Sequence, residues 1–298
     1  MKVYFIGMPN WFTKYTKKII LLIKFNFKNI KMKKLLLLTL FISLNSFAQE
    51  IHSFYTLDVP RSKANDFVKM HKKFIDIYFM GSEDNKMAST WLFSHTYGSD
   101  FTFKVIEVYP NIIAQASAVN YGVEVNKNID NMDISYDEKK MLKDEWSTYF
   151  QLFLEGHDDE IRVTFDNQIF ITENDIDFSK KHIVVFNESN PKWKDRREYI
   201  SLWNKSTRQS SIDLGEALAI VPTGHYSGSS YTFQAAFWYS SWESFLVNQK
   251  SLENSGPMND DQKRMWDISG NHKDEITTFL GCTWASKGMP SKTFTIAE

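Results

Sequence analysis

The sequence has one cysteine, Cys282, in 298 residues. An intrachain disulfide is therefore excluded, and so is a metal site made of several cysteines. We interpret Cys282, between Gly281 and Thr283, as a small residue of the hydrophobic core. The chain also lacks an HExxH pair, a Walker loop, a Rossmann fingerprint and the nucleophile elbow of Ser-His-Asp hydrolases. These absences remove the familiar catalytic motifs, and the residues identify no cofactor.

Acidic residues are missing from the first 48 positions, which contain nine lysines. Residues 49–298 then hold 26 Lys and Arg against 36 Asp and Glu, a net charge of −10. An acidic surface repels phosphate backbones, so we expect no nucleic-acid partner. The composition, 43% hydrophobic and 15% aromatic, is ample for a globular core.

A long hydrophobic run is also absent. The longest apolar stretch, Leu35 to Leu44, is well short of the roughly 20 residues that cross a bilayer. It follows Met32-Lys33-Lys34 and precedes Ser46-Phe47-Ala48, the order of a secretory signal peptide. We predict a signal peptide at 32–48 cleaved after Ala48, with no stable membrane anchor afterwards. Residues 1–31 are an extended N-terminus or the result of a start codon assigned too early. The protein is expected to be exported, as a periplasmic or secreted protein.

Alternation and helical spacing predict the order β-α-β-β-α-β twice, the split βαβ or ferredoxin-like arrangement. The expected elements of the first unit are strands at 52–59, 87–97, 101–109 and 161–165, with helices at 62–78, 111–119 and 137–154. Those of the second unit are strands at 182–186, 217–226, 231–239 and 276–282, with helices at 193–208, 242–249 and from 260.

Short matches support a duplication. The segment His95-x-x-Gly98-Ser99-x-Phe101-Thr102-Phe103 recurs 130 residues later as His225-x-x-Gly228-Ser229-x-Tyr231-Thr232-Phe233. At the same offset His52 falls on His182, and His157-x-Asp159-Glu160-Ile161 recurs as His272-x-Asp274-Glu275-Ile276. We predict a first ferredoxin-like unit at 49–167, a linker at 168–180 and a second unit at 181–298.

This duplicated element order resembles the dimeric α+β barrel superfamily, which includes antibiotic-biosynthesis-monooxygenase-like proteins and haem-binding relatives of chlorite dismutase. The resemblance covers about residues 51–285 and rests on no family motif. It implies an α+β fold in which the two fused βαββαβ units form a pseudo-dimeric barrel. It assigns no function to individual residues.

The histidines are the main site candidates. We expect His95 near His157, and His225 near His272, at one rim of the barrel. His95 and His225 are candidate catalytic bases. The candidate metal ligands are the other two histidines and the acidic residues that follow them: His157, His272, Asp159, Glu160, Asp274 and Glu275. The alternative is structural, because a histidine beside a turn often caps backbone groups.

Aromatic residues on or beside the strands indicate a further possibility: Trp91, Trp238, Tyr239, Trp242 and Trp284. They either line an apolar ligand cavity or belong to an ordinary core. The first hypothesis is therefore an exported protein that binds a small apolar ligand in a barrel. The alternatives are an oxygenase- or isomerase-like enzyme with a histidine base, and haem or metal binding.

Overall fold

The computed structural model describes residues 49–80, 86–98, 100–118, 121–172, 176–254, 256–285 and 289–298. The predicted signal peptide at 32–48 and residues 1–31 lie outside these ranges. Gln49–Glu298 forms one compact unit. In the described residues, no helix is both long enough and apolar enough to span a bilayer.

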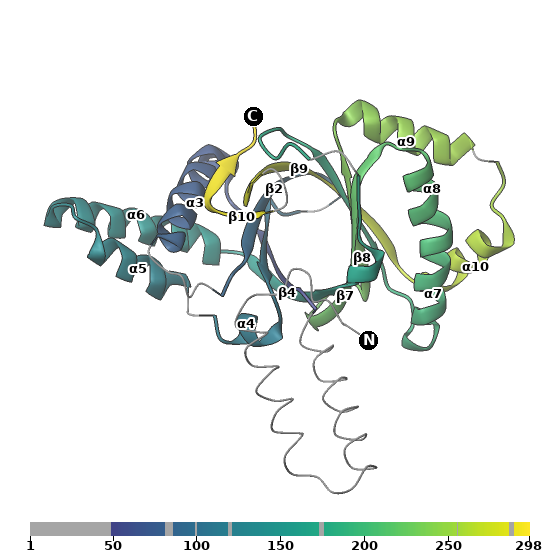
Figure 1. Cartoon of the computed structure of the whole chain (residues 1–298), viewed down its shortest axis with the longest axis horizontal. Helices are drawn as coiled ribbons and strands as arrows, with labels where there is room; N and C mark the ends of the chain where they lie inside the picture. Colours follow the sequence, from purple (N-terminus) through teal and green to yellow (C-terminus); the bar gives the residue numbers. More distant parts are fainter. Residues whose placement is uncertain are drawn as a thin grey trace, which may run out of the picture. The chain divides into compact units, whose positions relative to one another are not determined.

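Eight antiparallel strands close into a barrel, seen end-on in Figure 1. Around the ring the order is β9-β2-β3-β1-β4-β7-β8-β6, and β6 pairs with β9 again. The barrel strands, in chain order, are β1 (Ile51–Leu57), β2 (Ser89–Tyr97), β3 (Phe103–Tyr109), β4 (His157–Thr164), β6 (Ile183–Ser189), β7 (Ala217–Gly228), β8 (Phe233–Tyr239) and β9 (His272–Ala285). Two further strands lie beside the ring: β5 (Phe170–Ile171) pairs with β7, and β10 (Met289–Ile296) pairs with β9.

Helices cover the barrel on two opposite sides (Figure 1). One group packs on the outer face of β1 and β3: α3 (Ala64–Phe79), α5 (Tyr121–Asn131) and α6 (Tyr136–Leu154), with α4 (Ile112–Ala116) after β3. The other group consists of α7 (Arg196–Trp203), a π-helical segment (Asn204–Arg208), α8 (Gln209–Asp213), α9 (Trp242–Asn254) and α10 (Asp260–Ile268). Capping boxes begin α6 at Ser135 and Glu138, and α10 at Asn259 and Gln262.

Strand alternation separates the inside of the barrel from the helix-covered outside. All seven residues of β3 are buried, because Phe103, Val105 and Tyr109 face the helices while Ile106 and Val108 face the interior core. Cys282 is also buried in the interior core, and burial raises its thiol pKa to about 12. The prediction of a core cysteine is confirmed.

The two halves of the barrel pair in corresponding ways. Tyr109 lies opposite Ile51, and Tyr239 lies opposite Ile183. His157 lies opposite Leu57 in the same way that His272 lies opposite Ser189. These registers place Ile183, not Lys181, in the position of Ile51. The expected gap-free match of His52 with His182 is therefore wrong by two residues. Tyr239 follows Tyr109 by 130 residues, but their strand partners Ile183 and Ile51 are 132 residues apart.

Most predicted elements exist, but some boundaries were wrong. β4 starts at His157 and β9 at His272, four residues earlier than expected in each half. The helix expected from Ser62 begins with a 3₁₀ turn at Arg61–Lys63 and has no side-chain cap. The expected linker at 168–180 contains β5. Neither α5 nor β10 was predicted.

Candidate functional site

The barrel interior contains a largely apolar cavity of about 410 Å³ at one end. Its walls come from strands of both halves and from the segment between β4 and β6. The main lining side chains are Trp91, Phe93, Phe178, Phe186, Trp238 and Trp284. Small residues, Ala219 on β7 and Ala236 on β8, leave the space open. This cavity is the best-formed candidate site of the described chain.

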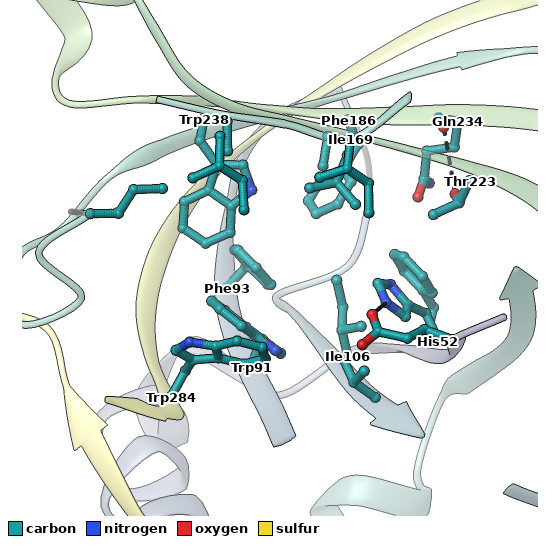
Figure 2. A pocket seen from close by; sticks show the side chains of 18 of the residues that line it. His52, Trp91, Phe93, Ile106, Ile169, Phe186, Thr223, Gln234, Trp238 and Trp284 are labelled. Carbon is teal, nitrogen blue, oxygen red and sulfur yellow. Dashed lines mark hydrogen bonds and ion pairs between the residues drawn. The ribbon is translucent and has the colours of Figure 1, made fainter. Parts of the chain in front are cut away.

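Three tryptophans form the aromatic end of this cavity (Figure 2). The Trp91 ring lies 5.7 Å from the Trp238 ring and 5.6 Å from the Trp284 ring, centre to centre. Trp91 is fixed further because its Nε1 donates to Ser89 Oγ at 3.0 Å. Of the aromatic candidates, Trp91, Trp238 and Trp284 line the cavity, which is the first of the two alternatives. Tyr239 and Trp242 instead pack against Phe245 outside the barrel.

A small polar group faces the tryptophans across the same cavity: His52, Thr223 and Gln234, as Figure 2 shows, together with Glu50. His52 Nε2 lies 3.7 Å from Glu50 Oε2. Gln234 donates from Nε2 to Glu188 Oε1 at 2.5 Å, which commits its amide nitrogen. Sequence reasoning used His52 only as part of the repeat and did not consider Glu50. The only available signal was that His52 and Phe54 share one face of the predicted strand.

The opposite end of the interior is charged. A second pocket of about 420 Å³ is lined there by Lys104, Lys273, Glu160, Glu188 and Glu275, among other polar residues. Lys104 donates from Nζ to Glu275 Oε2 at 2.5 Å, and Lys273 donates to Glu275 Oε1 at 2.6 Å. Burial opposes ionisation of Glu275, but these two ammonium groups hold its pKa below the ordinary value.

Arg162 is a fully buried cation whose partners line the charged pocket. It pairs with Glu160 through Nε, and its Nη2 donates to Ser230 Oγ and to the Tyr231 carbonyl, both at 2.8 Å. Burial raises the pKa of Glu160 and lowers that of Arg162, while each charge partly offsets the shift of the other. The guanidinium therefore fixes the position of β4 against the β7–β8 turn.

The structure does not bring the predicted histidine pairs together. His95 on β2 and His157 on β4 lie towards the same end of the barrel. However, β3 and β1 lie between their strands. His225 on β7 is separated in the same way from His272 on β9 by β8 and β6. At about 4.8 Å per strand step, three steps exceed any coordination distance. The expected proximity is wrong because the strand order is β2-β3-β1-β4 in one half of the barrel and β7-β8-β6-β9 in the other. In each half, the two strands that contain the histidines are therefore the outermost of the four.

Each predicted histidine has local contacts. His157 Nδ1 contacts the Leu154 carbonyl at 2.9 Å, and its Nε2 lies 3.5 Å from Asp159. His272 contacts Ser189 Oγ at 3.2 Å and Asp274 at 3.4 Å.

The other two predicted histidines, His225 and His95, contact residues of their own hairpins. His225 Nε2 contacts the Gly228 carbonyl at 2.7 Å, and the His95 ring packs against Phe101 at 5.2 Å. These contacts fit the structural alternative. Within the described ranges, no group of three or more His, Cys, Asp and Glu side chains could hold a metal ion.

Three of the four acidic candidates, Asp159, Glu160 and Glu275, line the charged pocket. Glu160 pairs with Arg162, and Glu275 pairs with Lys104. Asp274 accepts from Asn187 Nδ2 at 2.9 Å. The backbones at Asp274 and Asp159 approach Gly98 and Gly228 so closely that a Cβ on either glycine would collide with the aspartate carbonyl. With φ of 98° and 101°, these two turn positions require glycine.

None of the predicted histidines is placed to act as an axial haem ligand in the apolar cavity. Such a ligand must point into the haem space. Of the histidines in the described part of the chain, His52 alone lines this cavity, and its Nε2 lies beside the Glu50 carboxylate. His95, His157, His225 and His272 do not line it.

The barrel geometry defines a class of fold, a closed antiparallel α+β barrel with helices outside, and solved structures of this class are similar to the chain. A candidate monooxygenase from Fusobacterium nucleatum is 14% identical, with 81% of this chain and 96% of that chain covered and a TM-score of 0.53. An anthrone oxidase-like protein is 9% identical, with 81% and 94% covered and a TM-score of 0.48. A chlorite dismutase variant from Candidatus Nitrospira defluvii is 8% identical, with 77% and 90% covered and a TM-score of 0.44.

No protein-family model matches the chain, and no curated protein matches it. The first of these structural similarities supports the closed α+β barrel as the fold, as expected from the sequence. At 14% identity it carries no activity across to this chain.

Proposed function

We propose that this protein binds a small, largely apolar molecule in the cavity of about 410 Å³. The volume and the aromatic lining carry the proposal. Small-molecule sites have volumes of roughly 300–1,000 Å³ and apolar walls with a few polar groups. Eight-stranded barrels are just wide enough for side chains to fill. Here Ala219 and Ala236 stand where larger side chains would close the space.

A neutral fluorescent probe, N-phenyl-1-naphthylamine, tests the proposal. We expect saturable binding to the full chain, with the probe emission rising. Ala236→Trp should fill the cavity and weaken binding at least about tenfold, equivalent to about 1.4 kcal/mol. Ala116→Trp on the exposed surface of α4 is the matched control and should bind like the wild type. Circular dichroism checks that both variants are folded. Absence of saturable binding, or equal binding by the two variants, contradicts the proposal.

An oxygenase- or isomerase-like activity with His95 or His225 as the base has less support. Neither histidine lines the apolar cavity, and the Nε2 atom of His225 already contacts the Gly228 carbonyl. Haem binding has less support because neither histidine lines the apolar cavity. Metal binding has less support because no group of three or more His, Cys, Asp and Glu side chains in the described ranges could hold an ion. An absorption spectrum of the purified chain separates these alternatives, since a Soret band would favour haem.

We also propose that the two halves are copies of one βαββαβ unit. The corresponding registers of β1 with β3 and of β6 with β8 support this. Superposition of residues 51–165 on 182–285 should bring His95 onto His225. Hairpins that fail to superpose would reject the duplication.

Export remains a further proposal, supported by the residues of the predicted signal peptide alone. Cleavage after Ala48 would leave Gln49 first, directly before β1. N-terminal sequencing of the exported form should start at Gln49 or within two residues of it. An exported form that keeps Met1 or Met32 would reject the predicted cleavage.

A further inference from the structure

The apolar cavity is polarised, with tryptophans at one end and His52, Thr223 and Gln234 at the other (Figure 2). A purely hydrocarbon ligand would not use the second group. Buried polar atoms cost free energy when they lack partners, so a polar cluster in an apolar wall favours a ligand with a matching polar group.

His52 is the central member of this cluster. Its side chain is 12% exposed, and its Nε2 atom is buried with no hydrogen-bond partner among the described residues. The closest charge to that atom is the Glu50 carboxylate, at 3.7 Å, which is too far for a hydrogen bond. Glu50 is half-exposed at the same end of the cavity. The imidazole therefore has the Glu50 carboxylate beside it and a ring nitrogen that has no hydrogen-bond partner in the described part of the chain.

The described side chains packed around His52 leave its Nε2 atom without a hydrogen-bond partner, so that a ligand can supply one. Arg162 lies opposite His52 on β4, but its guanidinium reaches away to Ser230 and Tyr231. Phe54 on β1 covers one side of the imidazole, at 6.2 Å between ring centres. On the other neighbour, β3, Val108 lies opposite His52. None of these groups takes the hydrogen bond that His52 Nε2 lacks.

We infer that the bound molecule carries one weakly acidic O–H or N–H group and that His52, supported by Glu50, accepts its proton. This inference rests on the proposed binding function. In the transfer the ligand's O–H or N–H bond breaks, the electron pair stays on the ligand atom, and the proton forms a new N–H bond on the imidazole. The Glu50 carboxylate then faces an imidazolium. No oxidant or cofactor enters this step.

A matched pair of small aromatic probes tests the inference: 4-nitrophenol, which has an acidic hydroxyl, and 4-nitroanisole, in which that hydroxyl is methylated. Calorimetry should show that the full chain binds 4-nitrophenol about tenfold more tightly, as expected for one hydrogen bond to a charged group. The bound nitrophenol should also show the yellow anion at a lower pH than the free compound.

The variants separate His52 from general effects. His52→Phe should remove the preference for 4-nitrophenol while keeping the affinity for 4-nitroanisole, and Glu50→Gln should reduce it. His157→Phe, the same substitution at the other end of the barrel, should keep it. Equal affinities in the wild type, or a preference that survives His52→Phe, overturn the inference. If N-phenyl-1-naphthylamine still binds, the proposed function stands without it; if none of the three probes binds, both fail.

Discussion

The barrel interior is apolar at one end and charged at the other, although β1, β3, β6 and β9 contribute lining residues to both pockets. On β1 the change takes place around Phe54, which lines both pockets. On β6 it lies between Phe186, which lines the apolar cavity, and Glu188, which lines the charged pocket. The apolar end keeps open space between aromatic rings. At the charged end each buried cation has an acidic partner.

This difference indicates that the two ends of the barrel have different roles. Apolar side chains tolerate a cavity beside them because they need no hydrogen-bond partner when the space is empty. Buried charges tolerate no loss of a partner, because an unpaired ion in a poorly solvated interior is costly. We therefore expect the charged end to hold the strands in register and the apolar end to bind the ligand.

The largest expected effect is at the charged end. Lys104→Met should lower the free energy of unfolding by about 3–5 kcal/mol, because Glu275 loses its main buried partner. The double variant Lys104→Met, Glu275→Met should recover part of this loss, since no buried charge is then unpaired. Urea unfolding measures both. Lys73→Met, which breaks the more exposed pair with Glu145, is the control and should cost about 1 kcal/mol or less. A double variant no more stable than the single one would contradict this view of the charged end.

A smaller effect is expected at the β2–β3 turn, at the rim of the charged end. Gly98→Ala places a Cβ against the Asp274 carbonyl in a left-handed conformation. The control is Gly215→Ala, which has a similar positive φ but nothing within 4 Å. The control should cost about 1–2 kcal/mol, and Gly98→Ala should cost about 1–3 kcal/mol more. Equal losses in thermal unfolding would show that the turn moves freely away from β9.

The apolar end should respond more mildly. Phe93, which packs against Phe186 at 5.5 Å and Trp238 at 5.7 Å, can be shortened without leaving an unpaired polar atom. We expect Phe93→Leu to cost about 1–2 kcal/mol. Tyr136→Leu, at an exposed position of α6, should cost less than about 0.5 kcal/mol. A loss for Phe93→Leu as large as that for Lys104→Met would remove the proposed contrast between the two ends.

The fold was more accessible from the sequence than the site. Segments rich in aromatic and β-branched residues, such as Phe103 to Tyr109, identify strands, because composition is a local property. β4 was predicted late because His157-Asp158-Asp159-Glu160 has low strand propensity; pairing with β1 on one side and partly with β7 on the other makes it a strand.

The site depends on barrel closure, which is not a local property. The spacing of His95 and His157 in the sequence says nothing about the two strands that lie between them. Likewise the alternation around His52 gives two faces but does not say which of them becomes the interior. Lys104 and Arg162 were not predicted as interior residues, because a cation on a strand ordinarily indicates the solvent-facing side.

The smallest expected effect concerns two buried carboxylates with opposite pKa shifts, Glu275 inside the barrel and Glu107 beneath the helices. Burial raises the pKa of Glu107, although the hydroxyls of Tyr109 and Tyr55 donate to it at 2.7 Å and 3.2 Å. Burial acts on Glu275 too, but Lys104 and Lys273 bring its pKa below the ordinary value. Two neutral donors thus leave Glu107 difficult to ionise, while two cations make Glu275 easy to ionise.

The signs follow from linkage. Folded Glu107 keeps its proton to a higher pH than the unfolded chain does, so it lowers stability as pH rises from the ordinary glutamate pKa to the raised one. Folded Glu275 stays ionised to a lower pH, so its contribution is present above the ordinary pKa and is lost as pH falls through the lowered one. Glu107→Gln should therefore flatten the pH dependence of unfolding above the ordinary pKa, and Glu275→Gln should flatten it below. Urea unfolding across this pH range measures both slopes. The same change of slope in both variants would mean that the lysine pairs do not distinguish the interior carboxylate from the outer one.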